Sequence, residues 1–98
     1  MDDVWFEWDP AKAASNLRKH GVSFEEAQTA FTDDHALVID DPQHSTDEAR
    51  FILLGLSASL RMLVVVHVLR TDGGAIRLIS ARQATRSERA TYFERLRR

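Results

Sequence analysis

The sequence predicts a small α+β domain in which helices pack on an antiparallel sheet, in the element order β-α-α-β-β-β-β-α. Three observations lead to this class. The 98 residues are enough for one hydrophobic core but not for two, so we expect residues 1–98 to form a single domain. Helix-capping signals occur twice near the amino end and once near the carboxyl end. Between them, short apolar runs alternate with polar turns, a pattern typical of strands.

The first two elements are marked by their ends. Residues 4–8 contain three aromatic side chains and are expected to form a short strand. Asp9 can then cap a helix whose first residue is Pro10, where a missing N–H donor costs nothing. Gly21 can end this helix in the left-handed conformation. We therefore expect a helix over residues 10–20.

Residue spacing predicts the faces of this helix and the start of the next one. Leu17 is expected to face the core, together with Ala13 and Ala14. Three polar side chains share another face: Lys12, Asn16 and Lys19. A capping box that opens at Ser23 predicts a second helix over residues 24–31. The link between the two helices is so short that we expect a helical hairpin.

The remaining chain is predicted to form strands followed by a helix. Four strands are expected, over residues 36–39, 48–56, 61–70 and 75–82. Short turns at residues 57–60 and 71–74 suit antiparallel hairpins. A capping box at residues 85–88 predicts a last helix that runs to about residue 96. Its core stripe is expected to contain the stem of Arg89, Phe93 and Leu96.

The charges are sorted along the chain. Residues 1–49 hold three basic residues against twelve carboxylates, a net charge of −9. Residues 50–98 hold ten basic residues, all arginine, against three carboxylates, a net charge of +7. Because a guanidinium presents a planar set of donors that matches phosphate oxygens, nucleic acid is the first partner to consider. The alternative is that the two halves pair with each other on the surface.

Composition excludes several other classes. The chain has no cysteine, which rules out disulfides, a thiolate zinc site and a cysteine nucleophile. The acidic start lacks the apolar run of a signal peptide. The longest apolar stretch, residues 62–66, is far below the roughly 20 residues of a membrane span. We therefore expect a cytoplasmic protein that does not associate with membranes.

The four histidines lack metal-binding spacing, so we expect no metal and no cofactor. His67 differs from the other three because it interrupts an otherwise apolar strand. It is either a core histidine with a satisfied hydrogen bond or a proton carrier. An acidic segment in the middle of the chain is interpreted as a solvated loop. Its carboxylates are Asp40, Asp41, Asp47 and Glu48.

The available side chains suit metal-free cleavage of RNA. In that reaction the 2′-OH of the substrate attacks the adjacent phosphorus, so the protein need not supply a nucleophile. Arginines can neutralise the phosphorane oxygens, but they stay charged and carry protons poorly. The proton would be carried by one of four groups: His67, His20, Tyr92 or Glu88. Because DNA lacks the 2′-OH, this chemistry selects RNA.

Several motifs, in order along nearly the whole chain, resemble the BrnT family. They are Phe6-Glu7-Trp8-Asp9, Lys19-His20-Gly21-Val22-Ser23-Phe24-Glu25-Glu26-Ala27, Glu48-x-Arg50, Leu54-Gly55-Leu56-Ser57, Arg77-Leu78-Ile79-Ser80-Ala81-Arg82-Gln83-Ala84 and Glu88-Arg89-x-x-Tyr92. The resemblance implies a ribonuclease toxin of a type II toxin–antitoxin pair, with a fold similar to the RelE toxins. It also implies a BrnA-like antitoxin that neutralises the toxin and provides the link to DNA. One departure is Leu60, where the family commonly has glycine before the arginine, so the turn geometry stays open.

The resemblance and the chemistry together select a candidate site. We expect catalysis from His67, Arg70 and Arg82. Flanking phosphates would be held by Arg77 and Arg86. Further contacts to the RNA backbone are expected from Lys12, Lys19, His20 and Arg50. The leading function is thus a metal-independent endoribonuclease that inhibits translation by cutting RNA. The alternative is a non-enzymatic module that binds nucleic acid or protein and acts in operon repression.

The alternation of strand residues complicates this site. Arg77 and Arg82 are five residues apart, so an unbroken pleat would place them on opposite faces of the sheet. The same holds for His67 and Arg70. Only a bulge or a strand end would bring such a pair to one face.

Overall fold

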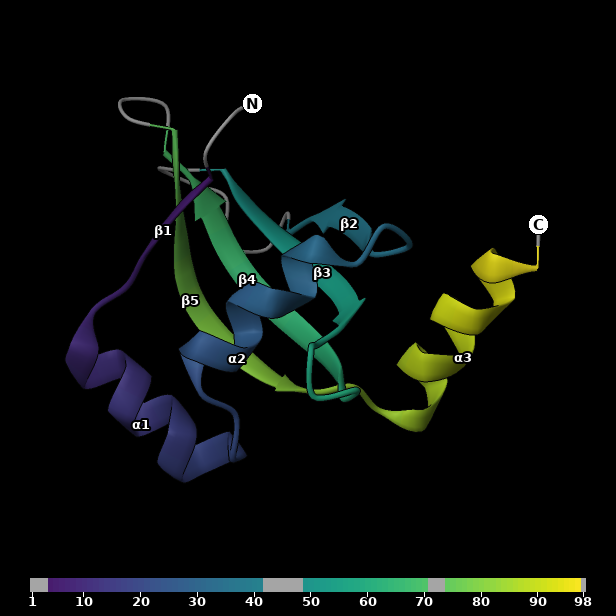
Figure 1. The fold of residues 1–98 in the computed structure, drawn as a ribbon, viewed down its shortest axis with the longest axis horizontal. Coiled ribbons are helices and arrows are strands. Elements are labelled where there is room, and N and C mark those ends of the chain that lie inside the picture. Colours follow the sequence, from purple (N-terminus) through teal and green to yellow (C-terminus); the bar gives the residue numbers. More distant parts are fainter. Residues whose placement is uncertain (1–3, 42–48, 71–73, 98) are drawn as a thin grey trace.

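A computed structural model describes residues 4–41, 49–70 and 74–97 of the chain. Within these ranges it shows a mixed α+β fold with a five-stranded sheet and three α-helices, so the predicted α+β class is confirmed (Figure 1). A 3-10 turn, η1, follows the second helix. Most of the acidic loop and of the turn predicted at residues 71–74 lies outside the described residues.

The sheet is mixed, not antiparallel as predicted. Its strands are β1 (Trp5–Glu7), β2 (Leu37–Asp40), β3 (Arg50–Leu56), β4 (Met62–Leu69) and β5 (Ala75–Gln83). Their order across the sheet is β1-β5-β4-β3-β2. Strands β2 to β5 pair antiparallel, whereas β1 pairs parallel with β5. This last pairing joins the first strand of the chain to the last strand, and no turn signal in the sequence predicts it.

The helix ends agree with their capping signals. Helix α1 spans Pro10–His20, with a hydrogen bond of 2.8 Å from the Ala11 N–H to Asp9 Oδ1 and with Gly21 at φ 70°. Helix α2 spans Phe24–Thr29 and continues into η1 at Ala30–Thr32. Helix α3 spans Arg86–Leu96, and both hydrogen bonds of its capping box are present. These short polar signals therefore fixed the helix boundaries well.

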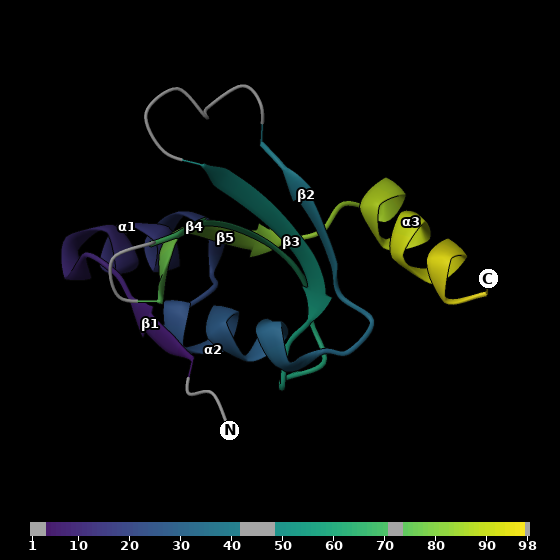
Figure 2. The same cartoon turned by 90° about the horizontal axis from the view of Figure 1, so that it is seen from above.

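The first two helices do not form a clear hairpin. Helix α2 lies under one face of the sheet, whereas α1 lies beside strand β5 (Figure 2). Phe24 and Ala27 of α2 are fully buried against the sheet. Because the sheet offers each helix more apolar surface than the other helix does, both pack on β5.

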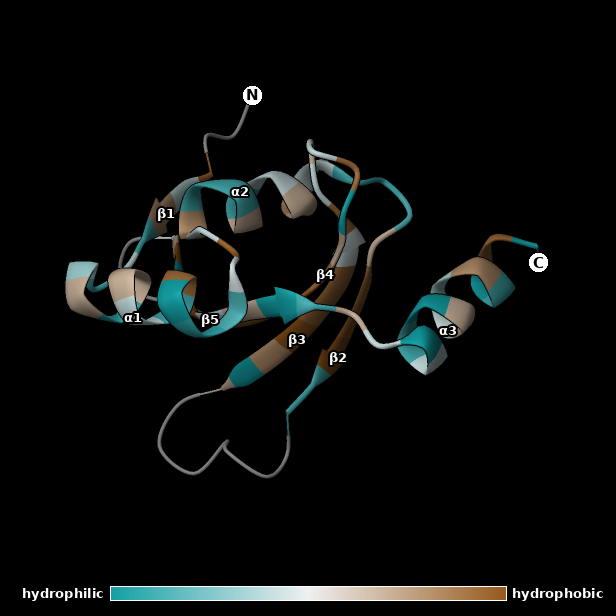
Figure 3. Ribbon diagram, turned by 90° about the horizontal axis from the view of Figure 1, so that it is seen from below, coloured by the Kyte–Doolittle hydropathy of each residue, from teal (hydrophilic) through white to brown (hydrophobic). Residues whose placement is uncertain are grey.

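The main core lies between α2 and the sheet. It contains Val22, Phe24, Ala27, Ala30, Leu53, Leu63, Val65, Leu78 and Ala81. We call this side of the sheet the helix face and the opposite side the arginine face. Strands β3 and β4 are the most apolar part of the sheet (Figure 3).

Helix α3 contacts the rest of the molecule differently from the prediction. Phe93 and Leu96, expected in its core stripe, are 43% and 42% exposed, whereas Tyr92 is only 4% exposed. The Tyr92 hydroxyl donates a hydrogen bond of 2.6 Å to Asp33 Oδ2. A polar contact at one position thus decides which face of α3 turns inward, because the helix has no strong apolar stripe of its own.

Candidate nucleic-acid interface

A bulge in β5 brings two key arginines to the same face. Val66 on β4 pairs with Ser80, but the next residue, His67, pairs with Leu78, so β5 carries one extra residue. Arg77 pairs with Val68, and Arg82 pairs with Val64. Val64 and Val68 are four residues apart on β4, so they share a face. The bulge therefore resolves the parity conflict in the sequence and places both arginines on the arginine face.

Two further arginines share this side of the sheet. Arg50 of β3 also pairs with Val68. Arg70 directly follows β4, and its N–H still donates a hydrogen bond to the Ala75 carbonyl at 2.8 Å. Its position continues the alternation of Val64 and Val68. The arginine face is therefore defined by Arg50, Arg70, Arg77 and Arg82.

Glu7 of β1 holds two of these arginines together. Its Oε2 atom lies 3.0 Å from Arg70 Nη1 and 3.6 Å from Arg77 Nη1. All three side chains are 35–40% exposed. Ion pairs at this exposure contribute little stability, so a phosphate group can replace the carboxylate at small cost. Glu7 was not among the predicted site residues, although its pairing with Arg77 places it on the arginine face.

Arg82 is held by Glu88, the residue that also caps α3. Two parallel hydrogen bonds of 2.8 Å join Arg82 Nη1 and Nη2 to the two carboxylate oxygens of Glu88. The hydrogen bonds from Arg82 outweigh burial and lower the pKa of Glu88 to about 2. Glu88 is therefore ionised at neutral pH and is a poor proton carrier. The carboxylate occupies the same edge of the guanidinium that a phosphodiester would use.

The remaining predicted arginines lie at the margins. Arg50 is partly buried, and its position at the start of β3 is on the same face. Arg86 is exposed at the first position of α3, four residues after Arg82.

His67, predicted as catalytic, does not lie with the arginines. It is only 3% exposed and faces the opposite side of the sheet, where its ring centroid lies 4.8 Å from that of Phe31. Its Nδ1 atom lies 3.2 Å from the Val65 carbonyl oxygen. Burial lowers the pKa of His67, so its neutral form is favoured. The structure thus agrees with the alternative of a core histidine, and the expectation that His67 joins Arg70 and Arg82 is wrong.

Tyr92, another possible proton carrier, is buried, and its hydroxyl is bound to Asp33. Burial, reinforced by the hydrogen bond to Asp33, raises the pKa of Tyr92 to about 12. The partner Asp33 has a lowered pKa, because hydrogen bonds from Tyr92, Leu56 and His35 outweigh its burial. The hydrogen bond between Tyr92 and Asp33 anchors α3, and the Tyr92 hydroxyl stays protonated at neutral pH.

Asn16 attaches α1 to the edge of the sheet. Asn16, predicted to share a polar face with Lys12 and Lys19, is only 7% exposed, whereas Leu17, predicted to face the core, is 50% exposed. Its side-chain amide donates to the carbonyls of Ala81 (2.8 Å) and Val22 (2.9 Å) and accepts from the Ala81 N–H (3.1 Å). Beyond the end of β1, Asn16 therefore makes hydrogen bonds to the backbone N–H and C=O of β5, as a neighbouring strand would.

A cleft opens between α1 and the bulge of β5. It has a volume of about 200 Å³ and is lined by Lys12, Ser15, Asn16, Lys19, His20, Ile79 and Ser80. Ser80 pairs with Val66, which shares the alternation of Val64 and Val68. The cleft therefore adjoins the arginine face, and Arg77 and Arg82 flank it along β5. Three of the predicted RNA contacts, Lys12, Lys19 and His20, are brought together here.

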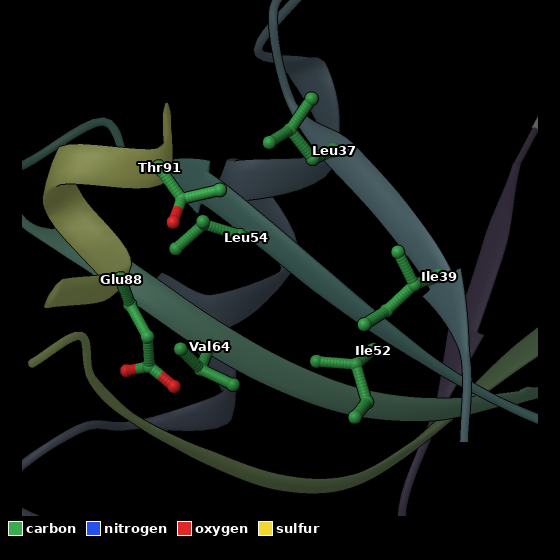
Figure 4. Close-up of a pocket in the computed structure, with 7 residues that line it drawn as sticks. All are labelled: Leu37, Ile39, Ile52, Leu54, Val64, Glu88 and Thr91. Atoms are coloured by element: carbon green, nitrogen blue, oxygen red, sulfur yellow. The ribbon is translucent and has the colours of Figure 1, made fainter. Parts of the chain in front are cut away.

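A second pocket on the same face is apolar. It has a volume of about 180 Å³ and lies between α3 and strands β2 to β4 (Figure 4). Its lining contains Leu37, Ile39, Ile52, Leu54, Val64, Glu88 and Thr91. Glu88 is the one charged group among these residues and is already bound to Arg82. This pocket suits apolar side chains and not a phosphodiester.

The described residues contain neither a cluster of metal ligands nor a membrane-spanning helix. In residues 4–41, 49–70 and 74–97, no group of three or more His, Asp or Glu side chains is placed to hold a metal ion. Over the same ranges, no helix is long and apolar enough to cross a bilayer.

The fold and the basic surface define a small α+β protein suited to bind an anionic chain. Comparison with protein families refines this class. Residues 8–88 match the family described as the ribonuclease toxin BrnT of type II toxin–antitoxin systems, and the chain belongs to this family. The structure is similar to the crystal structure of the Brucella abortus ribonuclease toxin BrnT, with 22% identity and a TM-score of 0.62 over 87% of this chain and 100% of that one. At this identity the likeness shows a shared fold. No curated protein matches the chain.

Proposed function

We propose that this chain is a metal-independent endoribonuclease that inhibits translation by cutting RNA. Membership of the ribonuclease toxin family supplies the class of activity. The single observation that favours a phosphodiester substrate here is the β5 bulge, which gathers Arg77 and Arg82 on one face beside the cleft of Lys12 and Lys19. A chain of phosphates can contact all four cations at once.

The proposed reaction uses the nucleophile that RNA itself carries. The 2′-oxygen forms a bond to the adjacent phosphorus, and the bond from phosphorus to the 5′-oxygen breaks. Negative charge develops on the non-bridging oxygens, where guanidinium donors stabilise it. In the free protein, Glu7 and Glu88 occupy these donors, and the substrate phosphates would replace them. The carboxylates thus keep the arginines oriented before RNA binds.

Further parts of the proposal rest on the family. We infer a fold of the RelE type, a single domain over residues 1–98, and action in the cytoplasm. We also infer that a BrnA-like antitoxin neutralises the chain, and that contact with DNA is made only through this antitoxin. Membership of a type II toxin–antitoxin family supports a protein antitoxin as partner. Co-expression with the product of an adjacent short reading frame would test it, with restored growth and co-purification as the expected result.

Cleavage of RNA by the purified chain is the primary test. Labelled RNA, incubated with and without EDTA, should be cut at equal rates and give 2′,3′-cyclic phosphate ends. An all-DNA strand of the same sequence should remain intact. Loss of cleavage with EDTA would contradict the metal-independent mechanism. Salt-dependent binding without scission would instead favour the non-enzymatic module.

Arg82 provides a test in cells. Arg82→Ala should lower the cleavage rate by about 100-fold and restore growth, because a donor to the phosphorane is lost. Glu88→Gln removes the same ion pair but keeps Arg82 and a capping side chain, so it separates catalysis from folding. Arg18→Ala, an exposed position on α1, serves as the matched control for loss of one positive charge. Toxicity of Arg82→Ala at equal expression would show that Arg82 is not catalytic.

A further inference from the structure

The cleft between α1 and β5 contains a histidine that the site otherwise lacks. Of the three histidines in the described residues, His67 is buried on the helix face and His35 is exposed in the segment between η1 and β2. His20, the last residue of α1, lines the cleft together with Lys12, Lys19 and Ser80. We propose that this cleft holds the scissile phosphodiester of RNA and that His20 is the catalytic residue that takes the proton from the 2′-OH. This inference rests on the proposed function.

The other proton carriers considered for this reaction are unsuited to it. Glu88 is bound to Arg82, and the buried Tyr92 hydroxyl donates a hydrogen bond to Asp33. His67 has the Val65 carbonyl and the Phe31 ring as neighbours. Histidine side chains exchange protons near neutral pH, whereas arginine and lysine ordinarily stay charged there. His20 is therefore the described side chain that combines this chemistry with a place in the basic cleft.

The surroundings of His20 fit an anionic substrate. From its own helix, Lys12 and Lys19 line the same cleft, and from β5, Ser80 offers a hydroxyl group. On the side of α2 and β4, Arg61 is bound to Glu26, and Arg61 Nη2 donates to the carbonyl of Gly21 at 3.0 Å. Because Glu26 is bound to Arg61 and has a lowered pKa, it remains a carboxylate that neutralises Arg61. The charge facing the cleft is then positive.

The backbone of α1 is held firmly in place for this role. Asn16 joins the middle of the helix to Ala81, next to Ser80, and Gly21 ends the helix directly after His20. Along β5, Ser80 lies two residues from Arg82, about 7 Å in an extended strand. The Arg82 side chain can span this separation, so a scissile phosphate held beside Ser80 can accept hydrogen bonds from the Arg82 guanidinium.

The atoms of the proposed step balance without a cofactor. The bond from the 2′-oxygen to phosphorus forms while the imidazole of His20 accepts the hydroxyl proton. The bond from phosphorus to the 5′-oxygen breaks with its electron pair on the leaving oxygen. That oxygen takes a proton from a lysine ammonium group at the cleft. Exchange with water then restores both side chains, and the products are a 2′,3′-cyclic phosphate and a 5′-hydroxyl.

The experiment compares His20→Ala with His35→Gln in the purified, full-length chain. His20→Ala should cut RNA at least 100-fold more slowly, in the range that general acid–base groups contribute. Its binding of a 2′-O-methyl RNA of the same sequence, which cannot be cut, should change less than about threefold, because the lysines and arginines remain. Added imidazole should restore part of the rate of His20→Ala. His35→Gln should cut at the rate of the unmodified chain.

Two additional measurements exclude a merely structural role of His20. The cleavage rate of the unmodified chain should fall on acidification, because a protonated imidazole cannot accept the 2′-OH proton, and His20→Gln should lack this fall. Ser80→Trp fills the cleft from β5 without changing His20 and should also abolish cutting. The inference is overturned if His20→Ala or Ser80→Trp cuts at the normal rate while Arg82→Ala fails to cut. If the unmodified chain cuts no RNA, the proposed function itself fails.

Discussion

Replacing Asn16 by alanine should be among the most destabilising single changes in this protein. The change removes three hydrogen bonds between α1 and its neighbours, at 2.8, 2.9 and 3.1 Å. Without the Asn16 side chain, the N–H and C=O of Ala81 and the C=O of Val22 are buried with no hydrogen-bond partner from it. Each buried polar group left in this state costs about 1–3 kcal/mol. Partial access of water to the helix end reduces the sum, so we expect a loss of about 3–4 kcal/mol.

Urea unfolding, followed by the fluorescence of Trp5 and Trp8, measures this loss. For a domain of this size, the melting temperature should also fall by about 15 °C or more. Ser15→Ala is the matched control, because Ser15 is the exposed neighbour and should change stability by less than about 0.5 kcal/mol. A loss below about 1 kcal/mol for Asn16→Ala, with an unchanged dependence on urea, would refute the idea that Asn16 joins α1 to β5.

Three further changes test separate features. The Glu88 carboxylate, with its pKa lowered to about 2 from an ordinary 4.5, should contribute stability above pH 4.5 that is lost as the pH falls toward 2. After allowance for exposure this amounts to about 1 kcal/mol, and Glu88→Gln should remove that part of the pH dependence in acid titrations followed by circular dichroism. Gly55→Ala should cost about 2 kcal/mol in urea unfolding, because a Cβ atom would lie 3.0 Å from the Ala30 carbonyl oxygen; an unchanged midpoint would contradict this. Leu60→Gly should raise stability by about 1 kcal/mol, since Leu60 has φ 64°, and a lower melting temperature would contradict it.

The sequence predicted local features of this fold better than distant ones. Asp9, Ser23 and Thr85 each form the cap that their position predicts, because a helix end depends on residues within one turn. Leu60 was noted as a departure where glycine is usual, and it adopts a positive φ. The pairing of β1 with β5 was missed, because it depends on the packing of residues about 70 positions apart in sequence.

In the candidate site, too, residue types could be predicted from the sequence, whereas their positions in space could not. The basic residues were found from composition and motif, yet their placement required the register of the sheet. His67 was assigned to the site because a polar residue stood in an apolar strand, but Phe31 and Phe51 accommodate its ring in the core. Asn16 was predicted only to share a helix face with Lys12 and Lys19, since helical spacing alone cannot reveal that the backbone of β5 lies beside it. The five-residue interval between Arg77 and Arg82 was the available clue to a bulge.

The extra residue in β5 has a consequence for how this surface can vary. If β5 lost its bulge while keeping Ile79, strict alternation would force either Arg77 or Arg82 into the core or require the whole end of the strand to rotate. Deleting Ile79 would instead leave the two arginines four residues apart and on one face without a bulge, so the bulge is needed because five positions separate them. Ile79 itself is only partly buried, so its side chain can vary while the two positive charges keep their places on the strand.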